Sequence, residues 1–160
     1  KKFWPKTIIK KFQKIKHKKI LARKAKEIPG AKQVIRKLYK KYKLGLLSSK
    51  TRTLMYPHLK QINLSTNFFK FIFSSDDVKF YKPDPRVFSK AIKKLKFKKN
   101  EILYVGDSIY DCIAAKKAKL NFIAVLTGVY TKNDFQKHRI NNRNILKSIK
   151  ELPQWLDKNG

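Results

Sequence analysis

The chain has 160 residues and a formal net charge of +31, from 41 basic residues against 10 acidic ones. This length is enough for one domain with a real core. The single cysteine, Cys112, excludes an intrachain disulfide and is typical of a reducing compartment, so we expect a cytoplasmic location. These residues contain no apolar run near the roughly 20 that cross a bilayer, and we expect no membrane partner.

Lysine dominates the positive charge, since only six of the 41 basic residues are arginine. Such a charge suits nucleic acid or another polyanion. Dedicated nucleic-acid surfaces tend to use the bidentate fork of arginine, however, whereas a coding sequence poor in G and C accumulates lysine without selection for binding. We interpret the charge as mainly compositional and keep nucleic acid as a partner that is not favoured.

The first predicted elements are helices. Apolar residues recur at roughly helical spacing among lysines over residues 7–26, which predicts one or two surface helices. Pro29 and Gly30 break this pattern, and a second helical pattern follows over residues 31–42. A domain boundary near residue 28 fits this change.

Four short apolar runs follow, at residues 44–47, 71–73, 102–105 and 122–126. Helical patterns at residues 51–62, 85–95 and 109–118 lie between them. Strands that are apolar on both faces and alternate with helices are typical of parallel β-α units. The sequence therefore predicts an α/β fold with a doubly wound parallel sheet, in which ligands bind beyond the carboxyl ends of the strands.

Candidate anion-binding residues follow the first apolar run. Ser48 and Ser49 come directly after it, and a helical pattern begins at Thr51. Hydroxyl groups and free N–H groups at a strand-to-helix turn can hold an anionic oxygen, because a helix N-terminus is electropositive. Capping of the helix by Ser49 or Thr51 is the competing interpretation, and it is favoured when this segment is taken alone.

A lysine with restricted surroundings follows the second run. Lys82 stands directly before Pro83-Asp84-Pro85, and the two prolines fix its direction ahead of the next helix. A lysine held in this way can neutralise a phosphoryl group and an attacking carboxylate.

Two aspartates follow the third run. Asp107 comes after Gly106, and Asp111 lies four residues later where a helix begins, so both side chains can face one point beyond the sheet. Hard oxygen ligands in this position suit Mg²⁺, which takes one or two protein carboxylates and leaves its other positions to water and phosphate. Helix capping would explain Asp107 alone but not the pair, and Gly106 is interpreted as letting the backbone come close to a ligand. Cys112, beside them on an apolar helix face, is interpreted as a core residue.

Ser48, the segment from Lys82 to Pro85 and the Gly106-Asp107-x-x-x-Asp111 pattern, in this order, resemble the second to fourth motifs of the haloacid dehalogenase (HAD) superfamily. Further segments are similar to its phosphoglycolate-phosphatase-like branch, and the resemblance covers about residues 28–156. It implies a HAD-like Rossmannoid core over residues 29–160 and a remnant of an α-helical cap over residues 1–28.

The resemblance also implies roles for these residues. Ser48, with Ser49, would bind the phosphoryl oxygens, and Lys82 would stabilise the nucleophile and the phosphate. Asp107 would ligate Mg²⁺, while Asp111 would support the metal or orient Lys82. The implied activity is a Mg²⁺-dependent phosphatase for a small phosphorylated metabolite. The family suggests 2-phosphoglycolate, while pyrophosphate, a sugar phosphate and a nucleoside monophosphate stay open.

The first motif of the family, a strand ending in Asp-x-Asp, is not found among the ten acidic residues. In the family its first carboxylate forms an aspartyl-phosphate and its second acts as acid and base. Asp76 and Asp77 come closest, but adjacent residues of an extended chain point to opposite sides. We expect the missing strand to lie upstream of Lys1 in an intact enzyme, and the 160 residues alone to be inactive. The alternative is a degenerate, non-catalytic relative that binds RNA or a ribonucleoprotein through its lysine-rich surface.

Overall fold

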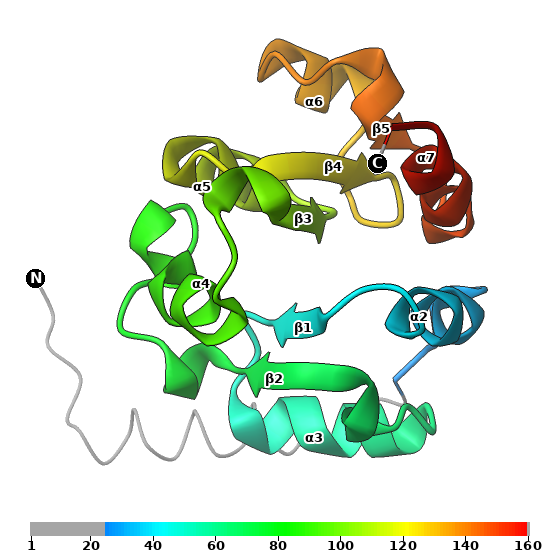
Figure 1. Ribbon diagram of the computed structural model, residues 1–160, viewed down its shortest axis with the longest axis vertical. Coiled ribbons are helices and arrows are strands. Elements are labelled where there is room, and N and C mark those ends of the chain that lie inside the picture. Colours follow the sequence, from blue (N-terminus) through cyan, green and yellow to red (C-terminus); the bar gives the residue numbers. More distant parts are fainter. Residues whose placement is uncertain (1–24, 160) are drawn as a thin grey trace, which may run out of the picture.

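The computed structural model of the protein describes residues 25–159. Its helices and strands, labelled in Figure 1, are α2 (Ala31–Tyr39), β1 (Leu44–Leu47), α3 (Arg52–Gln61), β2 (Phe69–Phe73), α4 (Ser89–Leu95), β3 (Leu103–Gly106), α5 (Ile109–Ala118), β4 (Asn121–Val125), α6 (Lys132–Lys137), β5 (Ile145–Leu146) and α7 (Leu152–Asn159). Short 3-10 turns connect several of them, among them η2 (Ser75–Asp77) and η3 (Pro85–Phe88). Within the described residues, no helix has the length and apolar character needed to span a membrane.

The predicted strands and helices agree with these elements to within two or three residues. The helix expected over residues 85–95 is divided into η3 and α4, because Asp84 caps a tight first turn that begins at Pro85. The helices expected over residues 7–26 lie outside the described residues, apart from residues 25 and 26, which are not helical. The cap expected over residues 1–28 therefore stays a prediction.

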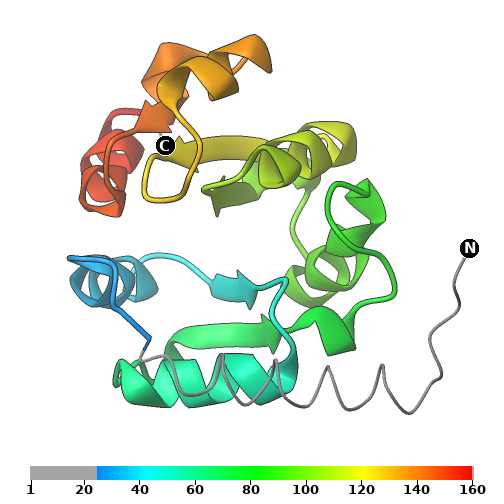
Figure 2. The same cartoon turned by 180° about the vertical axis from the view of Figure 1, so that it is seen from behind.

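All strand pairs of the described chain are parallel, but they form two sheets where the sequence predicted one. β1 pairs with β2, and β3, β4 and β5 form a second sheet in that order. Both views of the molecule show β1 and β3 as the strands that face each other across the space between the two sheets (Figures 1 and 2). The sheet is divided because no strand of the described residues pairs with these two edges.

Strand β4 shows how the core is built on both faces of the larger sheet. Phe122 and Ala124 belong to a buried cluster with residues of α5, α6 and η3, whereas Ile123 and Val125 belong to a second cluster with residues of α2 and α7. Successive side chains of a strand point to opposite faces, so an uninterrupted apolar run requires cover on both sides. The doubly wound α/β arrangement predicted from the sequence is confirmed.

Candidate functional site

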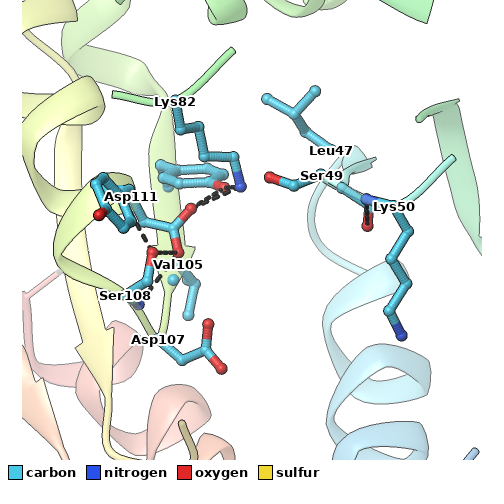
Figure 3. Close-up of a pocket in the computed structure, with 12 residues that line it drawn as sticks. Leu47, Ser49, Lys50, Lys82, Val105, Asp107, Ser108 and Asp111 are labelled. Carbon is cyan, nitrogen blue, oxygen red and sulfur yellow. Dashed lines mark hydrogen bonds and ion pairs between the residues drawn. The ribbon is translucent and has the colours of Figure 1, made fainter. Parts of the chain in front are cut away.

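The carboxyl ends of β1 and β3 meet around one pocket of about 490 Å³. Its lining consists of residues 47–50, 104–108 and 110–111 together with Lys82. Figure 3 shows Lys82, Asp107 and Asp111 on one side of this pocket and Ser49 and Lys50 on the other. The structure therefore brings together Ser48, Ser49, Lys82, Asp107 and Asp111, the five residues singled out in the sequence, in the place where an α/β sheet binds ligands.

Lys82 and Asp111 form a buried ion pair on one wall of the pocket. The Nζ atom of Lys82 lies 2.6 Å from Oδ1 of Asp111, and their side chains are only 11% and 6% exposed. Burial alone would raise the pKa of Asp111, but the charge of Lys82 and the hydrogen bonds from Lys82, Ser108 and Tyr104 outweigh it and lower the pKa. The Asp111 carboxyl is therefore ionised at neutral pH beside Lys82.

Tyr104 completes this pair from strand β3. Its hydroxyl accepts a hydrogen bond from Lys82 Nζ at 2.8 Å and donates one to Asp111 Oδ1 at 2.9 Å. Burial, with the charge of Asp111, raises the pKa of the Tyr104 phenol, so the hydroxyl stays protonated as a donor. The ring packs edge-to-face on Phe88, with 4.7 Å between centroids, which fixes its orientation.

The second oxygen of Asp111 is also occupied. The backbone N–H and the hydroxyl of Ser108 donate to Oδ2 at 3.1 and 2.7 Å, and the hydroxyl accepts from the Asp111 N–H, which forms a capping box at the start of α5. With both oxygens engaged, the geometry favours Asp111 as the residue that orients Lys82 over Asp111 as a metal ligand.

Gly106, the glycine before Asp107, makes room for a neighbouring side chain. A Cβ atom added to Gly106 would lie 2.6 Å from Cβ of Asp111, so the missing side chain makes room for Asp111. The approach of the backbone to a ligand, which the sequence suggested, stays a prediction. Contact between residues on a strand and on the following helix depends on the tertiary fold, and the local motif does not reveal it.

Asp107 is the carboxylate of the pocket that remains available. Its side chain is half-buried and makes no hydrogen bond or ion pair within residues 25–159. Gly128 lies against it, since an added Cβ would come 2.8 Å from the Asp107 carbonyl oxygen and 2.9 Å from Oδ2. The described residues contain no cluster of three or more histidine, cysteine or acidic side chains for a metal. A single free carboxylate fits Mg²⁺ that takes its remaining ligands from water and phosphate.

The opposite wall is formed by the turn after β1. The Ser48 N–H donates to the Phe73 carbonyl at 2.8 Å and so continues the pairing with β2, while the Ser48 hydroxyl accepts from the Lys50 N–H at 3.1 Å. Thr51 is the N-cap residue of α3, but its side chain makes no cap hydrogen bond. Ser49 is exposed at the pocket and does not cap the helix.

Asp76 and Asp77 lie on η2, after β2, and do not line this pocket. Asp77 accepts from the backbone and the hydroxyl of buried Ser74 at 2.9 and 2.6 Å and pairs with Arg52, and these hydrogen bonds, chiefly the one from the Ser74 hydroxyl, lower its pKa. Asp76 accepts from the Arg52 N–H at 2.7 Å. Both carboxylates tie the turn after β2 to the start of α3, in agreement with their exclusion as a catalytic pair.

Sequence reasoning missed Tyr104 and Ser108. The one available signal for Tyr104 is a hydroxyl-bearing residue inside an otherwise apolar strand, since a buried tyrosine usually finds a hydrogen-bond partner. Cys112 was correctly placed in the core, where it is fully buried and burial raises the pKa of its thiol.

Comparison with known proteins points to one group. The chain matches the haloacid dehalogenase-like hydrolases over residues 1–125. It is 28% identical over 134 residues to a glyceraldehyde 3-phosphate phosphatase of Pyrococcus furiosus, covering 82% of this chain and 54% of that protein. It is 36% identical over 94 residues to the pyrophosphatase PpaX of Anoxybacillus flavithermus, covering 58% and 43%. The chain thus spans about half the length of these curated relatives.

A solved structure shares most of the fold. The crystal structure of a haloacid dehalogenase-like hydrolase from Bacteroides fragilis superposes with a TM-score of 0.81 at 25% identity. The match covers 94% of this chain and 72% of the other. The arrangement of both sheets and their helices is therefore similar to that of a longer protein.

Proposed function

Because the chain belongs to the haloacid dehalogenase-like hydrolase family, we propose that its pocket is the phosphate-binding part of a Mg²⁺-dependent phosphatase. The observation that carries the proposal is the oriented Lys82, held by Asp111 and Tyr104 beside the free carboxylate of Asp107. Small phosphorylated metabolites are the proposed substrates. The two curated relatives named above are phosphatases of this general kind, one for a triose phosphate and one for pyrophosphate.

Six residues of the pocket have a proposed task. The Lys82 ammonium neutralises charge on the phosphoryl group, and Asp111 with Tyr104 keeps it aimed without a change of conformation during the reaction. The hydroxyl of Ser48, together with the hydroxyl and the N–H group of Ser49, holds phosphoryl oxygens from the opposite wall. Asp107 would ligate Mg²⁺, which when bound supplies positive charge to the phosphoryl oxygens.

The nucleophile of the proposed reaction, an aspartate that would form an aspartyl-phosphate, lies outside these 160 residues. Among the described residues the pocket holds two carboxylates, of which Asp111 is engaged by four donors and Asp107 is assigned to the metal. The chain by itself is therefore expected to bind phosphate without hydrolysing a phosphoester.

Calorimetric titration of the 160-residue chain with inorganic phosphate in the presence of Mg²⁺ tests the binding role. We expect binding at one site that Lys82→Met weakens by about tenfold or more, because a charge-assisted contact worth about 1.5–3 kcal/mol is lost. Lys93→Met, at an exposed lysine of α4, is the matched control and is expected to bind like the unaltered chain. Equal weakening by both substitutions would mean that phosphate binds the general positive surface and would overturn the proposal.

The net charge of +31 supports a second candidate, binding of RNA by a non-catalytic chain. A titration of RNA binding against salt distinguishes an RNA-binding chain from one whose lysine surface reflects composition alone. Binding driven by phosphate contacts weakens steeply between about 50 and 200 mM salt but starts from substantial affinity. A lysine surface that reflects composition alone shows no appreciable affinity at the upper value.

A further inference from the structure

A cluster of lysines lies at the ends of the strands opposite to the pocket. The pocket is built at the carboxyl ends of β1 and β3. At the amino ends, three loops lead into β1, β3 and β4, at residues 40–43, 96–102 and 119–120. These loops contain one acidic residue, Glu101, and seven lysines. We refer to the three loops as the basic face, and its lysines are Lys40, Lys41, Lys43, Lys96, Lys98, Lys99 and Lys119.

Two contacts join the loops of the basic face. The Nζ atom of Lys43 lies over the ring of Phe97, 4.9 Å from its centroid, and connects the loop before β1 with the loop before β3. The side-chain amide of Asn121, at the start of β4, donates to the Asn100 carbonyl at 2.6 Å and connects the loop before β3 with the loop before β4. The lysines therefore belong to one surface, although the sequence places them in three separate segments.

The lysines of the basic face carry charge that is open to a partner. All seven side chains belong to exposed residues. Lys41 is the one that forms an ion pair within residues 25–159, with Asp157 at 3.8 Å. A group of like charges without counterions on the protein attracts a polyanion and favours its association.

Composition alone does not determine this arrangement. A high lysine content raises the charge of the whole surface, but the acidic residues are divided unequally between the two ends of the strands. Six of the ten acidic residues follow the carboxyl ends of β2, β3 and β4, and these are Asp76, Asp77, Asp84, Asp107, Asp111 and Asp134. The basic face at the other end is left with charge of almost one sign.

Two lysines of the basic face stand where glycine would be more stable. Lys96 and Lys119 follow the last residues of α4 and α5, with φ of 59° and 60°. Glycine adopts this left-handed conformation at a helix end without the steric cost of a Cβ atom. The two side chains therefore add charge to the basic face at the expense of stability.

Exposed aromatic rings lie among these lysines. Tyr42 and Phe97 belong to the first two loops and are 43% and 38% exposed, and Tyr39, directly before the first loop, is 51% exposed. Lysines that follow a phosphate backbone and rings on which unpaired bases stack are the two components of surfaces that bind single-stranded nucleic acid. An acidic peptide would use the charge but would leave the rings without a partner.

We propose that the basic face binds single-stranded nucleic acid, with its lysines on the phosphates and with bases stacked on Tyr42 and Phe97. The face lies at the opposite ends of the strands from Lys82 and Asp107, so a bound strand leaves the pocket free. The binding therefore does not depend on the phosphatase activity, and it does not require a chain that has lost catalysis.

The charge contribution is tested with a fluorescent oligonucleotide of about twelve uridines, whose binding to the 160-residue chain is followed by anisotropy between about 50 and 200 mM salt, without phosphate or Mg²⁺. The double substitution Lys96→Gln and Lys99→Gln is expected to weaken binding about tenfold at the lower salt. It should also reduce the slope of log affinity against log salt by about 1.4, because two phosphate contacts are lost. The matched control is Lys132→Gln with Lys147→Gln, at two exposed lysines beyond the carboxyl ends of β4 and β5, which should bind like the unaltered chain.

The stacking contribution is tested at Phe97. Phe97→Ala is expected to weaken binding of the oligonucleotide about tenfold, whereas Phe97→Trp, which keeps a stacking surface, is expected to retain it. Tyr81→Ala is the control, because Tyr81 is 60% exposed and lies outside the basic face. Lys82→Met should also bind the oligonucleotide like the unaltered chain, since the pocket takes no part.

Four results would overturn the proposal. Equal weakening by the two pairs of lysine substitutions would mean that the oligonucleotide binds the general positive surface. Unchanged binding by Phe97→Ala would exclude the stacking, and weakening by Lys82→Met would place the oligonucleotide in the pocket. Equally tight binding of a polyglutamate peptide of about twelve residues would make an acidic peptide the partner.

Discussion

The buried pair of Lys82 and Asp111 depends on two neighbours at the scale of single residues. The ammonium group of Lys82 is positioned at the pocket by its hydrogen bonds to Asp111 and Tyr104. The Asp111 carboxylate is positioned in turn by a hydrogen bond from Ser108. A buried charge without such partners would be costly, since removing one member of a buried pair destabilises a protein by about 3–5 kcal/mol. The side chains that stabilise this part of the fold are thus the ones that would position a phosphate-binding cation.

Removal of the Tyr104 hydroxyl should loosen this arrangement without emptying the core. Tyr104→Phe keeps the ring on Phe88 but removes one donor to the Asp111 carboxylate and one acceptor for Lys82. We expect the free energy of unfolding to fall by about 1.5–3 kcal/mol, measured by urea denaturation. Tyr110→Phe is the control, because Tyr110 is 55% exposed and its substitution should change stability by less than about 0.5 kcal/mol. An equal effect of the two substitutions would contradict the stabilising role of the Tyr104 hydroxyl.

Asp111 should also make stability depend on pH. Its folded-state pKa is lowered despite burial, because Lys82 and the hydrogen bonds favour the carboxylate. A lowered pKa contributes stability that is fully present above the unfolded pKa of about 4 and is lost as pH falls through the folded value. Urea unfolding between about pH 2 and 6 should therefore show a steeper loss of stability on acidification for the unaltered chain than for Asp111→Asn. Parallel curves for the two would contradict this assignment.

Gly128 should matter for the metal through Asp107. A Cβ at this position would come within 2.9 Å of the Asp107 carboxylate and within 2.8 Å of its carbonyl oxygen, so Gly128→Ala must displace one of them. We expect the affinity for Mg²⁺, titrated with phosphate present, to fall by about tenfold, as for other groups that position a ligand. Val129→Ala, at a side chain that is 91% exposed, serves as the control. An unchanged affinity of Gly128→Ala for Mg²⁺ would contradict the role of Asp107 as a metal ligand.

At the scale of the elements, α5 both carries Asp111 and packs the core. Cys112, Ala114 and Ala115 on this helix are fully buried, and their small side chains let the helix lie close to the larger sheet. The helix begins with the capping box of Ser108 and Asp111 and ends at Lys119 in a left-handed conformation, with φ of 60°. Its first turn carries a residue of the pocket, whereas no residue of its last turn lines the pocket.

A substitution at the end of α5 should therefore be able to raise the stability of the protein. Glycine adopts the left-handed conformation without the steric cost that a lysine Cβ carries, so Lys119→Gly is expected to raise the free energy of unfolding by about 0.5–1 kcal/mol. Lys117→Gly, at an exposed position inside the helix, should lower it by about 1 kcal/mol. Thermal or urea unfolding of the two variants checks both signs, and a loss of stability in Lys119→Gly would show that the lysine side chain has a role of its own there.

At the scale of the whole molecule, the elements that could be predicted are those whose pattern is local. Residues 44–47 are a strand as expected because they are apolar on both faces and short, and residues 109–118 are a helix with the expected bounds. β5 was not predicted, since two residues are too few for any periodicity. The predicted alternation of strands and helices was sufficient for the fold class.

Five residues of the site were predictable from the sequence, but Tyr104, Ser108 and the contacts between the side chains were not. The motifs placed Ser48 and Asp107 directly after strands. They placed Lys82 and Asp111 near the starts of the following helical segments, and all four residues lie where they were placed. The contact between Lys82 and Asp111 joins residues 29 positions apart, and no local spacing determines which oxygen is used. The division into two sheets is also a long-range property, because it depends on what pairs with the edges of β1 and β3.

The central claim, a pocket that can bind phosphate in a chain that lacks the nucleophile, is tested most directly by release of p-nitrophenol from p-nitrophenyl phosphate. The purified 160-residue chain is assayed with Mg²⁺ alongside the phosphate titration, with Lys82→Met as the reference. The account predicts phosphate binding and no release above that of Lys82→Met. Mg²⁺-dependent turnover that Lys82→Met abolishes would contradict it, because one of the ten acidic residues present would then have to act as the nucleophile.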